Sequence, residues 1–199
     1  MRTSLLTTGP VVAISLLLSA CASDGGTPAG PATPSPSASP SPTASPREIP
    51  EDPTAPAGQC ADDALRVTIE PHPEGNSAGH VISLVAFTNI GSTACELQGA
   101  PAVAVVDAAG TVIGTGAVQL DWPEPPTITL EPGGRAVAGL SAADIDADGG
   151  PLGDECPTVA GAAYLVHPPH SWTPVQVPAA VPACDGEISW MTVTAVRAG

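Results

Sequence analysis

Acidic side chains between Asp144 and Glu155 have the most specific spacing for chemistry in this sequence. Three aspartates alternate with apolar residues, Gly149 follows them, and a glutamate closes the segment. This order matches the calcium-loop pattern Asp-x-Asp-x-Asp-Gly-x5-Glu, in which carboxylates converge on one ion and the glycine permits a sharp turn. The candidate metal ligands are Asp144, Asp146, Asp148, the Gly150 carbonyl oxygen and Glu155.

The surroundings of this loop are less typical of a calcium site. No helical pattern flanks it, so a helix–loop–helix hand is not predicted. Pro151 stands at the eighth position, where a backbone N–H is normally used, and proline has none to give. We therefore predict a weak calcium site with a dissociation constant of about 10⁻⁴ to 10⁻³ M, with a solvated acidic loop as the alternative. No other cofactor is predicted.

Two common catalytic motifs are missing from the sequence. It has no His-Glu-x-x-His pair and no glycine-rich phosphate loop. His167 and His170 could bring two imidazoles together, but prolines separate them and no third metal ligand is nearby. We interpret them as surface-loop histidines. The sequence thus predicts a protein that is not an enzyme.

Three tryptophans stand out in a chain that has one Tyr and one Phe. Trp122 and Trp172 lie in segments that resemble loops, whereas Trp190 alternates within a predicted strand and is assigned to the core. Exposed indoles among prolines suit contact with a protein or a carbohydrate. The alternative is that Trp122 and Trp172 cap the ends of the core.

An export signal is predicted over residues 1–20. Its apolar run, residues 11–18, is much shorter than the roughly 20 residues of a membrane-spanning helix. The run ends in Leu18-Ser19-Ala20-Cys21, the pattern of a lipobox. We predict cleavage before Cys21, lipidation of its sulfur with palmitate among the acyl chains, and stable anchoring. The protein is then expected on the extracytoplasmic face of the cell membrane.

Residues 21–58 are predicted to be the lipidated cysteine followed by a disordered linker. Between Ala22 and Glu48 there is no Leu, Ile, Val or aromatic residue, and residues 34–46 are rich in Pro and Ser. Such a segment cannot bury enough apolar surface to offset the entropy of ordering. Its prolines favour an extended tether. Whether its Ser and Thr are glycosylated is left open.

The charge of the chain excludes one class of partner. The sequence has 20 acidic residues against 5 basic ones, none of them Lys, and a net charge of −15. Binding to nucleic acid depends on neutralising phosphates with Lys and Arg, so nucleic acid is not a predicted partner. An acidic surface favours cationic partners or metal ions, or serves solubility alone.

Four cysteines follow Cys21, and an even number in an exported domain predicts disulfides. The first expected hairpin pairs Leu65 with Ile90, and extending that register brings the first two of these cysteines opposite one another. The second hairpin pairs Leu165 with Val175 and does the same for the last two. Each bridge contributes about 3 kcal/mol by loop closure. Over the two other connectivities we prefer Cys60–Cys95 and Cys156–Cys184.

Residues 59–199 fit one domain by length. Short β-branched runs recur between turn residues, and beyond one helical turn at Ser141–Ile145 no helix is expected. Asp107–Gly110 and Glu131–Gly134 are predicted turns. This pattern is typical of an all-β, immunoglobulin-like antiparallel β-sandwich. The predicted strands are Leu65–Glu70, His80–Asn89, Ala102–Val106, Thr111–Gly114, Thr127–Leu130, Arg135–Leu140, Ala160–His167, Pro174–Val177 and Ile188–Val196.

Several runs carry a family resemblance, the most specific being Thr-Asn-x-Gly-x-x-x-Cys-x-Leu-x-Gly-x-Pro at residues 88–101. The full set is Cys60–Val67, Phe87–Pro101, Leu130–Gly133, Cys156, Val166–Pro169 and Cys184. The chain resembles, over most of residues 60–196, an actinobacterial family catalogued as a domain of unknown function (number 4232). Ala100 departs from it, because the family tends to carry an aromatic residue there. The resemblance implies a lipidated or secreted protein with a tethered β-rich domain, and no catalytic residue.

Together these features predict a membrane-tethered cell-envelope lipoprotein whose non-enzymatic β-sandwich is a binding or interaction module. The predicted partners are the membrane, through the lipid anchor, and an envelope protein or glycan. The alternative is a structural or accessory envelope lipoprotein without a specific ligand. A saturable partner would distinguish the two.

Overall fold

The computed structural model describes Asp52 and residues 54–120, 123–145 and 149–199. These residues belong to one unit of the chain, Glu48–Gly199. No helix within these ranges is long and apolar enough to span a bilayer. Several sequence predictions lie outside the described residues: the signal peptide, Cys21, most of the linker, Trp122, Asp146 and Asp148.

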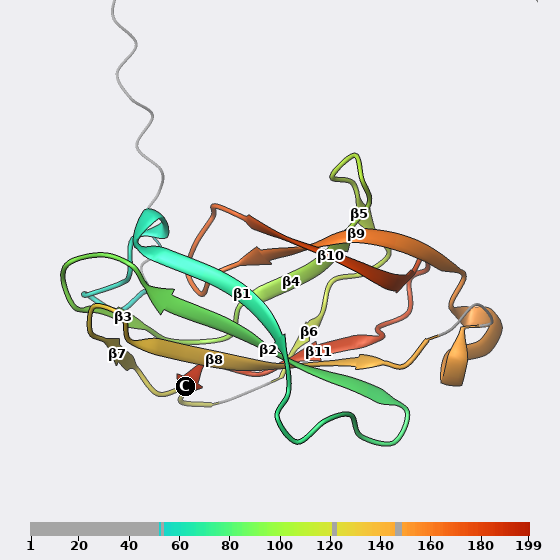
Figure 1. The fold of residues 1–199 in the computed structure, drawn as a ribbon, viewed down its shortest axis with the longest axis horizontal. Helices are drawn as coiled ribbons and strands as arrows, with labels where there is room; N and C mark the ends of the chain where they lie inside the picture. The colour runs from blue at the N-terminus through green and yellow to red at the C-terminus, as the bar shows by residue number, and fades with distance from the viewer. Residues whose placement is uncertain (1–51, 53, 121–122, 146–148) are drawn as a thin grey trace, which may run out of the picture. The chain divides into compact units, whose positions relative to one another are not determined.

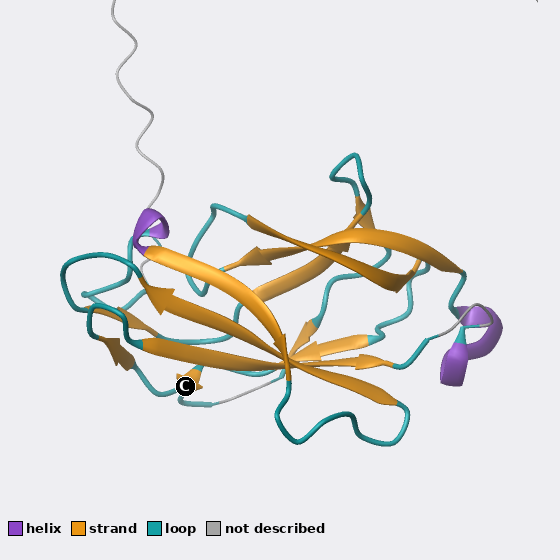
Figure 2. Ribbon diagram, in the orientation of Figure 1, coloured by secondary structure: helices purple, strands orange, loops and turns teal. Residues whose placement is uncertain are grey.

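The domain is an all-β sandwich, which confirms the predicted fold class (Figure 1 and Figure 2). The larger sheet consists of β1 (Leu65–Pro71), β2 (His80–Asn89), β8 (Arg135–Ala143), β11 (Met191–Val193) and β6 (Val118–Gln119), with β12 (Arg197–Ala198) also paired to β8. The smaller sheet consists of β10 (Val175–Cys184), β9 (Thr158–His167), β4 (Ala102–Val106) and β5 (Val112–Ile113). A separate pair is formed by β3 (Cys95–Leu97) and β7 (Ile128–Leu130). Among the named strand pairs only β6 with β11 is parallel.

The core lies between the two sheets and is mainly aliphatic, because the sequence offers few aromatic residues. Val85 and Phe87 of β2 and Val105 of β4 have no exposed surface. Burying a side chain of this size contributes about 1.5–3 kcal/mol. Ala136 of β8 is the cross-strand partner of Phe87, so the aromatic ring lies beside a small side chain.

Asn89, the last residue of β2, stabilises the turn that follows it. Its side chain is 1% exposed and is the one fully buried polar side chain among the described residues. Its Nδ2 donates to the carbonyl oxygens of Thr93 and Leu130, both at 2.8 Å, and its Oδ1 accepts from the Gly91 N–H at 2.9 Å. Since Leu130 ends β7, Asn89 also holds the β3–β7 pair against β2. The Asn89 and Gly91 positions of the most specific run of the resemblance therefore have a structural role.

Eight of the nine predicted strands are confirmed in position but differ in length. The ninth, Ile188–Val196, is largely wrong, because only Met191–Val193 (β11) forms a strand there. β8 runs to Ala143, so the helical turn predicted over Ser141–Ile145 is wrong, because β2 and β11 pair with β8 up to this point. β10 continues through Pro178 and Pro182 to Cys184, since an edge strand tolerates proline. β3, β6 and β12 were not predicted.

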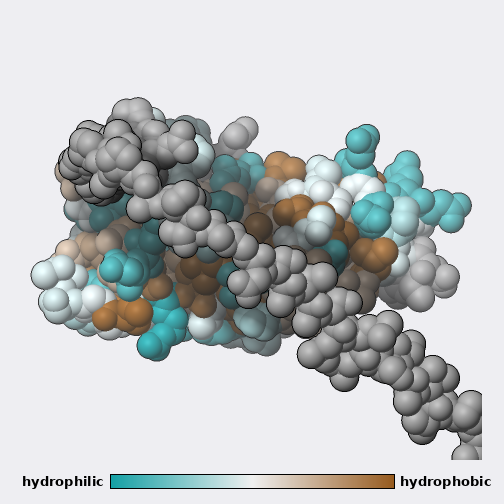
Figure 3. All heavy atoms as spheres, turned by 90° about the horizontal axis from the view of Figure 1, so that it is seen from above, coloured by the Kyte–Doolittle hydropathy of each residue, from teal (hydrophilic) through white to brown (hydrophobic). Residues whose placement is uncertain are grey.

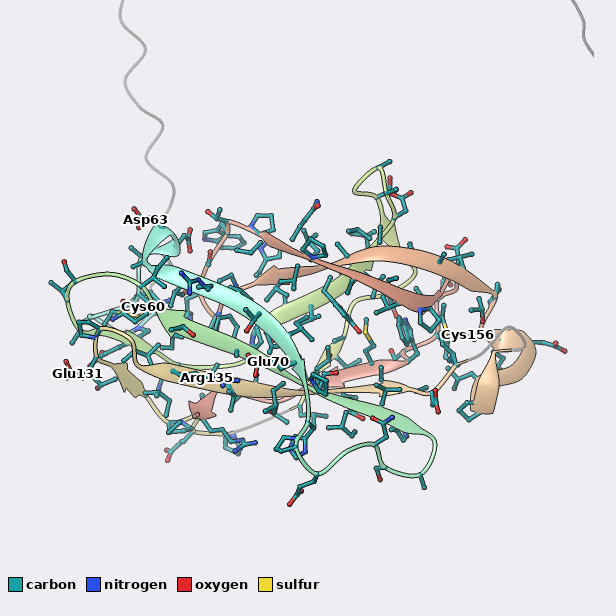
Figure 4. All side chains as sticks on the ribbon, in the orientation of Figure 1. Cys60, Asp63, Glu70, Glu131, Arg135 and Cys156 are labelled. Carbon is teal, nitrogen blue, oxygen red and sulfur yellow. A yellow bond between two sulfur atoms is a disulfide. The ribbon has the colours of Figure 1, made fainter. Side chains whose placement is uncertain are left out.

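Both predicted disulfides, Cys60–Cys95 and Cys156–Cys184, are present. The first joins the segment before β1 to β3, and the second joins the segment before β9 to the end of β10. Figure 4 shows Cys60 and Cys156 toward opposite ends of the sandwich. Each end of the domain is thus closed by a covalent bond.

The hairpin registers from which these pairings were argued are wrong by one residue. Leu65 pairs with Asn89 rather than Ile90, and Val175 pairs with Val166. A shift of one residue moves a side chain to the opposite face of the sheet, so these ladders cannot align the cysteines as expected. In the β9–β10 ladder Cys184 pairs with Thr158, two residues from Cys156, so this ladder still brings the second pair close together. The first pair lies beyond the end of the β1–β2 ladder. β3 carries the second cysteine away from the β1–β2 ladder and pairs with β7.

Both predicted turns are present. The Gly110 N–H donates to the Asp107 carbonyl oxygen at 3.1 Å and closes the β4–β5 hairpin. The Gly134 N–H donates to the Glu131 carbonyl oxygen at 2.6 Å. Gly133 has a φ of +80°, a left-handed conformation that glycine adopts without steric cost. Local sequence therefore determines these turns.

Candidate ligand-binding pocket

A pocket of about 510 Å³ lies where the β9–β10 loop meets the residues that precede β1. We call residues 168–174 the tip loop, and Asp52 with residues 54–61 the strap. A second hollow, of about 190 Å³, shares part of this lining. The larger volume falls in the range of roughly 300–1,000 Å³ that is usual for ligand pockets. Both hollows are lined by Asp52, His170, Ser171 and Trp172.

The tip loop turns sharply at residues 168–171. The Ser171 N–H donates to the Pro168 carbonyl oxygen at 3.0 Å, and φ of His170 is +60°. Proline at the second position and a left-handed residue at the third are the pattern of a type II turn, which normally has glycine at the third. His170 is the one non-glycine residue with positive φ in the part of the chain described. This backbone costs about 1–2 kcal/mol, which the contacts of its side chain must offset.

The imidazole of His170 is held by Asp52 and Thr54 of the strap. Its Nδ1 lies 3.0 Å from Asp52 Oδ2 and 3.3 Å from Thr54 Oγ1. The side chains of His170 and Asp52 are only 17% and 23% exposed. The interpretation of His170 as a surface-loop histidine is therefore wrong, because a segment distant in sequence covers it.

The same contacts keep Asp52 ionised. Its Oδ1 accepts hydrogen bonds from the Thr54 hydroxyl at 2.6 Å and from the Thr54 backbone N–H at 2.9 Å. The Thr54 hydroxyl bond first, and then the His170 bond, lower the pKa of Asp52 from 3.8 to about 2. At neutral pH a charged carboxylate therefore joins the strap to the tip loop.

Gln59 joins the strap to the tip loop a second time. Its Nε2 donates to the Pro169 carbonyl oxygen at 2.9 Å. Its Oε1 is buried and has no hydrogen-bond partner among the described residues. A buried acceptor without a partner is costly, so a ligand that donates a hydrogen bond here would be favoured.

Trp172 is 68% exposed, the largest value for any big apolar side chain among the described residues. The alternative that it caps the core is therefore wrong. Trp190 is 6% exposed, which confirms its assignment to the core. Figure 3 shows apolar residues as separate patches between hydrophilic ones on the side in view, without one continuous apolar face. An exposed indole beside a pocket is a typical anchor for a ligand.

The contacts of His170 favour binding over catalysis. In a nucleophilic relay, one ring nitrogen of the histidine meets an orienting carboxylate and the other meets the nucleophile. Here Asp52 and Thr54 both meet Nδ1. Nε2 points toward Gly99, where a Cβ would lie 3.6 Å away, and within the described residues no hydroxyl or thiol bonds to it. The arrangement fixes the loop and does not activate a hydroxyl.

The predicted calcium ligands are described only in part. Asp144, Gly150 and Glu155 are exposed, the last two in the 3₁₀ segment η2 (Gly150–Glu155), while Asp146 and Asp148 lie outside the described residues. The described ranges contain no group of three or more His, Cys, Asp or Glu that could hold a metal. The calcium site stays a prediction.

A third cavity, of about 80 Å³, lies between the two sheets and includes Tyr164, Val181 and Trp190 in its lining. Burial raises the pKa of Tyr164, and Trp190 Nε1 is buried without a partner among the described residues. This cavity is well below the usual size of a ligand pocket. The pocket at the tip loop is therefore the better candidate site.

The sequence contains no local signal for the role of Asp52. It lies 118 residues from His170 and in a proline-rich stretch that was assigned to the linker. The sequence does carry a local signal for the unusual backbone of the tip loop. A histidine stands directly after two prolines, where a type II turn calls for glycine.

The structure is a β-sandwich closed by a disulfide toward each end, with a pocket between the strap and the tip loop. The chain belongs to the family described as Domain of unknown function (DUF4232), whose sequence model matches residues 60–197. No curated protein and no solved structure is a significant match to the chain. Family membership brings no activity with it, so the function is argued from the pocket.

Proposed function

We propose that this protein is an actinobacterial cell-envelope lipoprotein, anchored through Cys21, whose non-enzymatic β-sandwich binds an envelope partner at the tip-loop pocket. The observation that carries the binding role is Trp172, exposed beside a histidine in a left-handed backbone. Strained backbone and exposed aromatic anchors concentrate at functional sites.

The construction of the pocket supports this role. Its walls come from the strap and the tip loop, which the Asp52–His170 and Gln59–Pro169 hydrogen bonds join directly. The Cys60–Cys95 disulfide fixes the end of the strap. A preorganised site loses less conformational entropy when a ligand binds, so these contacts favour affinity.

Site-specific photo-crosslinking in cells tests the binding role. A photoreactive amino acid at Thr173, which lines the pocket, is expected to capture a partner, and Trp172→Ala is expected to abolish the crosslink. The same probe at Val159, at the other end of β9, is the control. Identical crosslinks from both positions, or a crosslink that survives Trp172→Ala, would count against the proposal.

Membrane fractionation tests the anchor separately. The Cys21→Ala variant is expected to lose membrane partitioning and either to appear in the medium or to remain unprocessed. A variant that sediments with membranes as the parent does would show that the lipobox does not anchor the protein. This result would leave the binding role untouched, because the pocket does not involve Cys21.

A further inference from the structure

We infer that the tip-loop pocket takes a neutral oligosaccharide, with one sugar ring on the face of Trp172 and its hydroxyl groups donating to the polar atoms around it. The inference rests on the proposed binding function and names the chemical class of the ligand. Charge, hydrogen-bonding capacity and shape each support this class.

Charge disfavours anionic ligands. Every described arginine belongs to a strand of the larger sheet, β1, β8 or β12, and none lines either hollow. Figure 4 shows Arg135 beside Glu70, to which it is bonded at 2.8 Å. An anion in the pocket would meet the exposed carboxylate of Asp62 without an arginine to compensate. In a chain of net charge −15 this repulsion is not offset elsewhere.

Charge does not favour cationic ligands strongly either. Asp52 is already engaged by His170 and by Thr54. Asp62, in the 3₁₀ turn η1 (Asp62–Ala64), is exposed to solvent. A single exposed carboxylate holds a cation weakly, because water screens the interaction. The pocket is therefore suited to a neutral polar ligand.

The hydrogen-bonding groups of the pocket suit hydroxyl donors. The unpartnered, buried Oε1 of Gln59 needs a donor. Thr173 also lines the pocket, and its hydroxyl can both donate and accept. The Ser171 hydroxyl is already bonded to the backbone of Thr173. Sugar hydroxyls have the same dual capacity. A neutral sugar can therefore satisfy these groups without bringing a charge into the pocket.

The shape of the site suits more than one sugar ring. The indole of Trp172 offers a flat face that attracts C–H groups, and one side of a sugar ring carries several of them. The hollows of about 510 and 190 Å³ share Trp172 and His170 in their linings. A chain of sugars can thus stack on the indole and occupy both hollows.

Isothermal calorimetry and tryptophan fluorescence of the full-length lipidated protein, in a zwitterionic detergent without a sugar headgroup, test the inference. The neutral probes are maltotetraose, cellotetraose and chitotetraose, and fully deacetylated chitotetraose is the matched cationic probe. At least one neutral probe is expected to bind saturably. Trp172→Ala is expected to weaken this binding by at least about tenfold, with partial retention in Trp172→Phe. Val112→Ala, at an exposed position outside both linings, is the control.

Three results would overturn the inference: no binding of any neutral probe at millimolar concentration, binding of the cationic probe alone, or equal affinities of the parent and Trp172→Ala. The crosslinking experiment separates these failures from failure of the proposed function. If the Thr173 crosslink still depends on Trp172, the pocket binds a partner and only the ligand class is wrong. If that crosslink is also missing, both proposals fail.

Discussion

Replacement of the buried Asn89 tests how the edge of the sandwich is held together. Its side-chain amide makes three hydrogen bonds, to the carbonyl oxygens of Thr93 and Leu130 and from the Gly91 N–H. Asn89→Ala removes all three and leaves these backbone groups without their partner. Asn89→Asp keeps the shape but turns an oxygen toward two carbonyl oxygens.

The expected loss of stability follows from the number of hydrogen bonds that the substitution removes. At about 1 kcal/mol of net stability for each hydrogen bond, Asn89→Ala is expected to cost about 3 kcal/mol, and more where a buried group stays unpaired. This is a large part of the roughly 5–15 kcal/mol that stabilises a typical domain. Asn89→Asp is expected to cost at least as much, although it leaves no cavity.

Urea unfolding of the full-length protein measures this cost as a fall in the midpoint at constant slope. Asn76→Ala is the matched control, because Asn76 is exposed and accepts one long hydrogen bond, 3.3 Å from the Ile82 N–H. It is expected to cost less than about 0.5 kcal/mol. If Asn89→Ala lost no more stability than Asn76→Ala, the buried network would not stabilise this edge as we argue.

Three further predictions concern ionisation, the core and the acidic loop. The pKa of Asp52 is lowered from 3.8 to about 2. The contact of Asp52 with His170 should therefore stabilise the fold fully above about pH 4, and this stabilisation should be lost as pH falls through about 2. An NMR titration of Asp52 with a midpoint near 3.8 would contradict this. Trp190→Phe leaves a cavity in the core, and because the lost Nε1–H has no partner among the described residues the cost in urea unfolding should be that of the cavity alone, about 1–3 kcal/mol; an unchanged midpoint would contradict the packing of Trp190 in the core. Calorimetry should show weak calcium binding that the Asp144→Ala/Asp146→Ala double variant abolishes. No heat from the parent at millimolar calcium, or equal heats from both proteins, would refute the predicted calcium site.

Local patterns in the sequence determine much of this domain. The longer strands follow from alternating β-branched runs, and the turns at 107–110 and 131–134 follow from their Asp, Pro and Gly residues. The four cysteines that follow Cys21 predict the two disulfides. The burial of Trp190 was predicted from an alternating pattern and is confirmed, although Trp190 itself lies just before β11. Each of these features depends on residues close together in the chain, so their types and spacing suffice.

Other features depend on how distant segments pack. Strand register was wrong by one residue, because turn residues alone do not fix the exact alignment of two strands. The exposure of Trp172 was left between two alternatives, since a loop indole can face the core or the solvent. The pocket itself requires Asp52 to meet His170 across 118 residues of chain. No local propensity encodes such a contact, and only the path of the folded chain brings the strap to the tip loop.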